Sequence, residues 1–178
     1  MSSQLPTPQD PPVFDRILRW SGIGWFSVVA TGQLAFIVFI LAFYGVRTAQ
    51  LNFPGWNDKP LIDGHIAGDS AGNAVFAIHV LLASVMILCG LMQLIPRLRQ
   101  AHPRLHRWTG RIYLTLAVVE ALSGIWLTVV RGTYLSQISA VAILVDAILI
   151  LGFAGLTWKN AVKRRFDRHR IWAMRTFM

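Results

Sequence analysis

The sequence predicts an all-α integral membrane protein: an antiparallel bundle of four transmembrane helices, with the start of a fifth helix at the C-terminus. Hydrophobic residues make up 54% of the 178 residues and charged residues only 14%, against about 25% charged residues in a typical soluble domain. The apolar residues fall in four long blocks, and most charges lie between these blocks. This pattern excludes a secreted disulfide scaffold, a disordered chain and an ordinary soluble enzyme.

Each apolar block is long enough to cross a bilayer, because a core about 30 Å thick takes about 20 helical residues. The predicted spans cover residues 24–46, 73–95, 109–130 and 137–158. The first span carries no charge, whereas each of the other three carries at least one ionisable side chain. The first block is too long for the apolar part of a signal peptide, so we expect it to be a retained helix.

The segments outside the spans suggest two divisions of the chain. Residues 1–20 are expected to form a disordered and then interfacial N-terminus, and residues 21–178 a transmembrane domain. Within the N-terminus, residues 14–20 place apolar and basic side chains on opposite sides of a short helix, as in helices that lie on a membrane surface. The longest connection, residues 47–72, is predicted to be an ordered loop with Trp56 as a membrane anchor.

The Lys and Arg residues predict how the bundle is oriented. Two of them precede the first span, five surround the second connection and seven follow the fourth span. The three exceptions are Arg47, Lys59 and Arg131. Because basic connections stay on the cytoplasmic side, we expect both termini in the cytoplasm. The net charge of +9 therefore favours contact with anionic lipid headgroups and not with nucleic acid.

Three of the spans carry a helical stripe of small residues with one ionisable group on it. These groups are His79, Glu120 and Asp146, and the span boundaries place them at similar depths. Small residues let helices approach closely, so that polar groups can bond across the interface. We expect these three side chains to form a buried polar cluster, in contact directly or through one water.

The predicted cluster has two interpretations. Uncharged carboxylic acids and a neutral imidazole can simply hold three helices together. Alternatively, ionisable groups inside a bilayer are often functional, as a proton relay, a metal site or a pocket for a quinone head. None of the predicted spans carries a second histidine at the His-x-x-x-His spacing typical of zinc sites, so no metal site is predicted in this cluster.

Two motifs that combine His, Arg and Trp lie at the predicted cytoplasmic face. Residues 105–113 read Leu-His-Arg-Trp-Thr-Gly-Arg-Ile-Tyr, and residues 167–175 read Asp-Arg-His-Arg-Ile-Trp-Ala-Met-Arg. With the Phe-Ala-Ile-His of residues 76–79 and the Gln-x-x-Pro-Arg of residues 93–97, they resemble a family of uncharacterised bacterial membrane proteins that carry a domain of unknown function. The resemblance covers about residue 73 to the C-terminus. It implies a bacterial inner membrane, and a further apolar helix after the second motif.

The same motifs are weakly similar to those of b-type cytochromes and ferric-reductase-like membrane proteins. That likeness implies haem b, with His106 and His169, or His79, as axial ligands. The motif arginines would then hold the haem propionates; they are Arg107, Arg111, Arg170 and Arg175. The competing interpretation is that these arginines and the tryptophans anchor helix ends among lipid headgroups or other anions.

The sequence favours a non-catalytic function. No hydrolase, phosphate-loop or metalloprotease motif occurs. We therefore expect a membrane subunit that packs with other membrane proteins, as an accessory subunit of an energy-transducing complex. Two alternatives stay open: a haem electron-transfer protein that uses His106 and His169, and a proton-coupled transporter that uses Glu120 and Asp146.

Overall fold

A computed structural model describes residues 12–59 and 62–177 of the chain. The N-terminal segment is expected to begin disordered; its residues 1–11 lie outside the described residues. The chain divides into two compact units, residues 1–35 and 36–178. The first unit is described by most of one long helix, α1 (Pro12–Phe39). This helix runs without a break through residues 14–20, where the sequence predicts a separate short helix.

The second unit begins with the end of α1 and continues through a π-helical turn η1 (Ile40–Gly45) into the short helix α2 (Val46–Ala49). A 3-10 turn η2 (Pro54–Asn57) lies in the connection that follows. The long helix α3 (Ser70–Leu94) comes next. Its start is fixed by Asp69, whose side chain accepts a hydrogen bond from the backbone N–H of Gly72 at 2.8 Å.

Two prolines divide the chain at the other end of α3. The short helix α4 (Pro96–Ala101) and the long helix α5 (Pro103–Val129) both begin at a proline, which lacks the N–H that a helix interior needs but fits its first turn. Helix α6 (Gln137–Val162) follows a capping box formed by Ser136 and Ser139. Arg164, in the left-handed region with a φ of 53°, reverses the chain into α7 (Phe166–Phe177).

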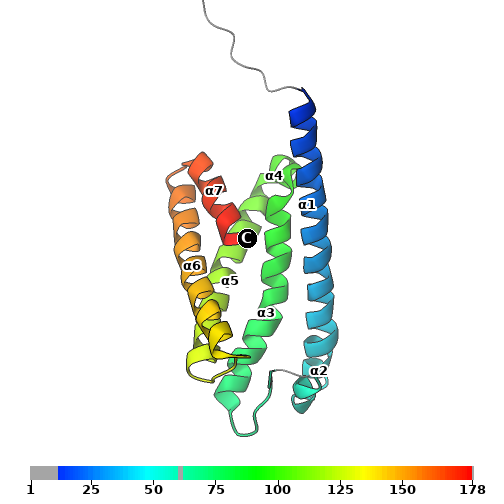
Figure 1. Ribbon diagram of the computed structural model, residues 1–178, viewed down its shortest axis with the longest axis vertical. Helices are drawn as coiled ribbons and strands as arrows, with labels where there is room; N and C mark the ends of the chain where they lie inside the picture. Colours follow the sequence, from blue (N-terminus) through cyan, green and yellow to red (C-terminus); the bar gives the residue numbers. More distant parts are fainter. Residues whose placement is uncertain (1–11, 60–61, 178) are drawn as a thin grey trace, which may run out of the picture. The chain divides into compact units, whose positions relative to one another are not determined.

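The second unit is an all-α bundle in which α3 packs on α5, α5 on α6, and α6 on α7. Figure 1 shows α7 returning from the end of α6 alongside α5 and α6. We call the end that carries residues 47–72 the loop end, and the end that carries α4 and the α6–α7 turn the basic end. Each end has its own apolar core, formed around Trp56 at the loop end and around Tyr113 toward the basic end.

Four helical segments of the described chain are long and apolar enough to cross a membrane, by length and composition. They are Val13–Ala49, Ser70–Leu94, Pro103–Val129 and Gln137–Val162. The four predicted spans are therefore confirmed as helices; each helix is longer than predicted, although the second and third end one residue earlier than the predicted bounds. Helix α7 has 12 residues and is not among them, although it begins where the sequence predicts the start of a fifth helix.

Candidate functional site

A polar pair joins α3 to α5 in the loop-end half of the bundle. The Nδ1 atom of His79 lies 2.9 Å from Oε2 of Glu120. The same nitrogen lies 2.8 Å from the Oγ atom of Ser123, in hydrogen-bond geometry. The contact with Glu120 is an ion-pair contact by distance, without that geometry. These two helices are the most closely packed neighbours in the bundle, so the pair lies at their principal interface.

Ser123 links the imidazole to the backbone of α5. Its hydroxyl lies 3.1 Å from the backbone carbonyl of Glu120, to which it can donate its one hydrogen. In that arrangement the Ser123 oxygen accepts from an N–H at Nδ1 of His79; in the other tautomer the hydroxyl donates to Nδ1. The N–H of the first tautomer also lies beside the Glu120 carboxylate, which it attracts. We call His79, Glu120 and Ser123 the polar centre.

The Glu120 carboxyl is buried but only partly bonded. Its side chain is 9% exposed, and that of His79 is 33% exposed. Within the described residues, the Oε1 atom of Glu120 is buried and has no hydrogen-bond partner. Most buried polar atoms in proteins do have a partner, and an exception calls for an explanation. The polar centre thus holds one open acceptor position inside a membrane-spanning helix.

An aromatic cluster covers the polar centre on the side of the loop end. Phe76, one turn before His79, packs with Tyr44, Trp56 and Leu127. The ring of Trp56 lies 5.7 Å from that of Phe76, and Trp56 is 2% exposed. The prediction that Trp56 is a membrane anchor is therefore wrong, because the loop folds inward and buries this side chain between helices.

Arg131 fastens the loop over this aromatic cluster. Its Nε lies 3.2 Å from Oδ2 of Asp69, an ion pair that does not meet hydrogen-bond geometry. Its Nη2 atom donates to the backbone carbonyl of Gly64 at 3.2 Å and to the side-chain oxygen of Asn73 at 2.8 Å. The side chain is 2% exposed. The segment before α3 is thereby tied to the end of α5.

Asp146 does not join the polar centre. It is exposed on α6, and no hydrogen bond or ion pair ties it to another residue in the described part of the chain. The expectation of one cluster built from three helices is thus corrected to a pair on α3 and α5. The reason is packing: α6 buries Ala140, Ala147 and Ala154, and this alanine face is turned about a quarter of the helix circumference away from Asp146.

The two motif histidines both lie at the basic end. His169, on α7, donates from Nδ1 to the backbone carbonyl of Thr157 at 3.1 Å. His106, on α5, has a buried Nδ1 without a hydrogen-bond partner in the described structure.

The four motif arginines lie on α5 and α7, and all four are exposed. Arg111 lies over the ring of Trp108 at 5.3 Å, and Arg175 over the ring of Trp172 at 4.6 Å. Within the described residues, no acidic side chain forms a salt bridge with Arg107, Arg111, Arg170 or Arg175. Their guanidinium groups are therefore available to anions outside the chain.

Sequence reasoning missed two residues of this region. Ser123 lies three residues after Glu120, on the same helical face, and this spacing could have identified it. In the sequence, Arg131 is marked only as one of three basic residues on the side of the membrane with few Lys and Arg residues. Its partners Gly64, Asp69 and Asn73 lie about 60 residues earlier, and no local pattern in the sequence signals that contact.

The fold and these polar groups define a class: a helical membrane protein with ionisable groups inside its bundle. A comparison with family models then identifies the family. The model described as "Predicted membrane protein (DUF2306)" matches residues 76–178, which is more than half of the chain. The chain therefore belongs to this family of membrane proteins of unknown function, as the resemblance of its motifs predicts.

The other comparisons add no relative. A search of the curated proteins and a search of the solved structures each found no significant match. The weaker likeness to b-type cytochromes and ferric reductases consequently has no support beyond the motifs themselves. The family match covers α5, α6 and α7 and most of α3, so it includes the whole polar centre.

Proposed function

We propose that this chain is a proton-coupled membrane carrier, and that the polar centre is where it takes up and releases the proton. The observation that carries the proposal is the Glu120 carboxyl: it is nine-tenths buried, contacts His79 through one oxygen and leaves the other oxygen without a partner. Ionisable side chains are costly inside a membrane and commonly mark ion or substrate pathways.

A purely structural role explains this arrangement less well. A carboxyl group kept only to join two helices is most stable when both oxygens are bonded, because an unpaired buried polar atom costs about 1–3 kcal/mol. An exchange site, in contrast, needs an acceptor that is free in one state and occupied in the other. Oε1 of Glu120 has this property, and the imidazole beside it can hold the proton in the alternate state.

A solute-panel measurement in liposomes tests the proposal. The purified protein is reconstituted with a pH-sensitive dye trapped inside, and small amines, carboxylates and sugars are added outside in turn. At least one class of solute should change the internal pH faster in these liposomes than in protein-free liposomes. The protein-free liposomes correct for the passive entry of uncharged amines. Glu120→Gln should abolish that difference, because an amide cannot exchange the proton.

A matched control removes a carboxylate elsewhere. Asp58 forms an exposed pair with Arg47 at 3.2 Å, so Asp58→Asn should leave the proton movement unchanged. The proposal fails if no class of solute moves protons through the wild-type protein, or if Glu120→Gln carries protons as fast as the wild type does.

A second candidate function is a non-catalytic membrane subunit that packs with other membrane proteins, as in an energy-transducing complex. The exposed carboxyl of Asp146 on an otherwise apolar helix favours it, because a polar group facing lipid is stabilised by a hydrogen bond from a neighbouring helix. Crosslinking in native membranes distinguishes the two functions. A cysteine at Asp146 should crosslink to a different protein if the subunit function holds, and to none if the carrier acts alone.

The orientation that we propose for the carrier puts the basic end in the cytoplasm of a bacterium, with the loop end outside the inner membrane. The support is the concentration of Lys and Arg at the basic end. In this orientation, four arginines contact phosphate groups of anionic lipids: Arg107, Arg111, Arg170 and Arg175. The rings under two of these arginines, Trp108 under Arg111 and Trp172 under Arg175, lie at the headgroup level.

A further inference from the structure

Helix α5 carries three arginines on one face near its start. Arg104, Arg107 and Arg111 recur at intervals of three and four residues, the spacing that places side chains on one side of a helix. Trp108 lies among them, and all four side chains are exposed. We call these four residues the arginine face. The Cζ atom of Arg111 lies 5.3 Å from the centre of the Trp108 ring, so its guanidinium reaches back toward the basic end.

The arginine face lies on the side of α5 that is turned away from its neighbours. Tyr113 is buried, and its hydroxyl donates to the backbone carbonyl of Thr176 on α7. Thr109 is also buried and accepts a hydrogen bond from α3. At 3.6 residues per turn, Arg104 and Arg111 lie about 140–180° around the helix axis from both of these residues. The arginines therefore point away from α3 and α7.

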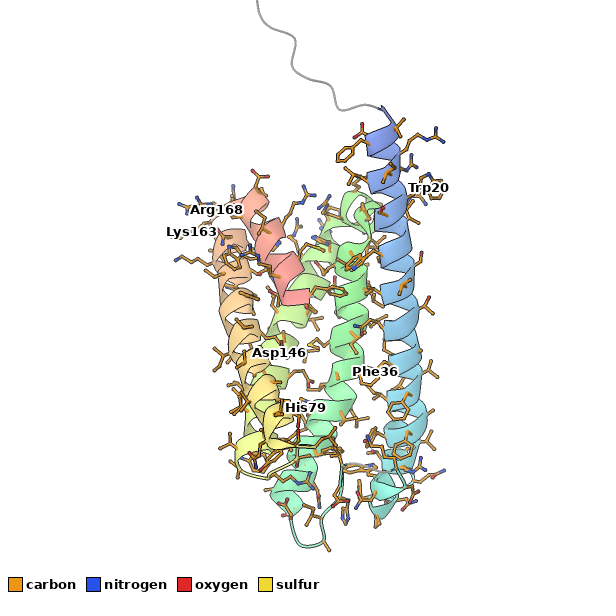
Figure 2. All side chains as sticks on the ribbon, in the orientation of Figure 1. Trp20, Phe36, His79, Asp146, Lys163 and Arg168 are labelled. Carbon is orange, nitrogen blue, oxygen red and sulfur yellow. The ribbon has the colours of Figure 1, made fainter. Side chains whose placement is uncertain are left out.

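The basic end holds almost no acid that could pair with the arginine face. Its two segments, residues 93–113 and 157–177, contain twelve Lys and Arg residues but a single acid, Asp167. Figure 2 shows two of these cations, Lys163 and Arg168, at this end. Within the described chain, no acidic side chain forms a salt bridge with an arginine of this face. Like charges three and four residues apart on a helix repel each other, so an anion from outside the chain would stabilise the face.

The depth of Arg111 indicates what kind of anion fits. Arg111 lies eight residues after the first residue of the membrane-spanning segment Pro103–Val129. Charged side chains in such segments usually face the bundle interior, but Arg111 faces outward. Beyond it, the same side of α5 is apolar and exposed at Leu122 and Val129. An anion that matches this side of the helix has an apolar chain attached to it, as a lipid does and a soluble polyanion does not.

The number of arginines indicates the headgroup. A guanidinium has five N–H donors and can bind two phosphate oxygens at once. Three such groups within two helical turns exceed what a phosphodiester, with two free oxygens and a single negative charge, can pair with. A phosphomonoester presents three acceptor oxygens and carries about −1.5 to −2 charges at neutral pH. The arginine face is therefore matched to a phosphomonoester.

We propose that the arginine face is a binding site for a lipid whose headgroup is a phosphomonoester, as in phosphatidic acid. Arg104, Arg107 and Arg111 bind the phosphate oxygens, and the acyl chains lie along the exposed side of α5. The inference rests on the proposed placement of the basic end among lipid headgroups, and it narrows that general contact to one site and one headgroup. The polar centre takes no part, because Glu120 lies on the opposite side of α5.

Thermal unfolding in a non-ionic detergent tests the site. Four compounds are titrated into the purified protein at constant ionic strength and at a pH at which the phosphomonoester is doubly ionised: dioctanoyl phosphatidic acid, dioctanoyl phosphatidylglycerol, dioctanoylglycerol and inorganic phosphate. Phosphatidic acid should raise the unfolding temperature saturably, with at least tenfold higher affinity than phosphatidylglycerol. Dioctanoylglycerol, which lacks the phosphate, and inorganic phosphate, which lacks the chains, should have no effect at the same concentrations.

Matched variants separate a defined site from general surface charge. Arg104→Gln and Arg111→Gln should each weaken phosphatidic acid binding at least tenfold, because each removes charge-assisted hydrogen bonds. Both side chains are exposed, so these variants should fold. Arg99→Gln removes the same charge from α4, outside the arginine face, and should change the affinity less than twofold.

Three results would overturn the lipid site. They are equal affinities for phosphatidic acid and phosphatidylglycerol, equal losses in Arg99→Gln and Arg111→Gln, and an equal effect of inorganic phosphate, which would make a free anion the ligand. The liposome measurement is independent of this test. Failure of phosphatidic acid to bind leaves the carrier standing, and an absence of proton movement overturns the carrier but not the lipid site.

Discussion

Arg131 is the side chain on which the loop end depends most. It is 2% exposed and bonds to residues that precede it by about 60 positions. Arg47 forms the corresponding pair with Asp58, but there the side chains are 24% and 59% exposed. The two arginines lie in the same region, and they differ in how completely water is excluded from their partners.

We therefore predict different costs for the same substitution at these two positions. Arg131→Gln should lower the free energy of unfolding by about 1–3 kcal/mol, because it removes a buried cation from a part-buried network of hydrogen bonds. Arg47→Gln should change it by less than about 1 kcal/mol, as is usual for exposed ion pairs. Thermal unfolding of both variants in the same detergent measures the difference. Equal losses would show that Arg131 is not the fastening point of the loop.

Two glycines of the bundle interior allow a second comparison between matched residues. A Cβ atom at Gly90 would lie 3.0 Å from the ring of Tyr113 and 3.1 Å from that of Phe177, closer than side chains normally pack. A Cβ atom at Gly124 would lie 3.6 Å from the ring of His79, an ordinary contact.

Gly90→Ala should therefore destabilise the protein by about 1–3 kcal/mol through overpacking, and Gly124→Ala should be close to neutral. Thermal unfolding of the two variants beside the wild type checks the ranking. If Gly124→Ala proved the more damaging substitution, the contact of α3 with the end of α7 would not be tight.

At the scale of elements, α7 is the helix whose placement the sequence predicts least. Its hydroxyl pair with α6 joins Thr157 to Thr176 at 3.2 Å between the two Oγ1 atoms, and Tyr113 binds the Thr176 carbonyl. These contacts hold a short helix against two long ones. The His-Arg-Trp pattern predicts that a helix starts here, but it does not indicate which helices that helix packs against.

A disulfide tests this placement. In a Cys89→Ala background, Thr157→Cys combined with Thr176→Cys should form a disulfide on mild oxidation, because the two Sγ atoms need to approach only to about 2 Å. Thr157→Cys combined with Arg175→Cys should not, since Arg175 is exposed and lies about 100° around α7 from Thr176. Mass spectrometry of an oxidised digest detects the bond. A bond in the control pair and none in the first would contradict the docking of α7.

The four long helices were predictable because their cause is local. A run of about 20 apolar residues must satisfy its own backbone hydrogen bonds in lipid, and a helix does so within the segment. Prolines and the Asp69 and Ser136 caps then bring the ends close to their predicted positions. The inward folding of Trp56 was not predictable, because tryptophan has the same local signature in a core and at a membrane surface.

At the scale of the whole molecule, the candidate site was predictable only in part. Intramembrane charge and small-residue spacing indicated His79 and Glu120, which the structure brings together. The same argument indicated Asp146, which lies apart from them. The difference depends on the rotation of α6 about its axis, and the alanines at 140, 147 and 154 are too small to dominate a hydrophobic pattern. Which face of an evenly apolar helix is buried depends on its neighbours.

The alternation of basic connections makes a prediction about the whole chain. Single cysteines at Asp58 and at Arg165, in a Cys89→Ala background, should react with a membrane-impermeant reagent from opposite sides of the membrane. Asp58 should react in intact cells, and Arg165 only after the membrane is opened. Labelling of both cysteines from outside would contradict the arrangement of four spans with a cytoplasmic basic end.

The central claim is that Glu120 exchanges a proton inside the bundle, and infrared difference spectroscopy tests it most directly. The reconstituted protein is cycled between low and high pH, and the C=O stretch of a protonated carboxylic acid is followed. The account predicts a reversible band that shifts in deuterated water and is missing from Glu120→Gln, but persists in Asp58→Asn. A wild-type spectrum without such a band, or an identical band in Glu120→Gln, would contradict it.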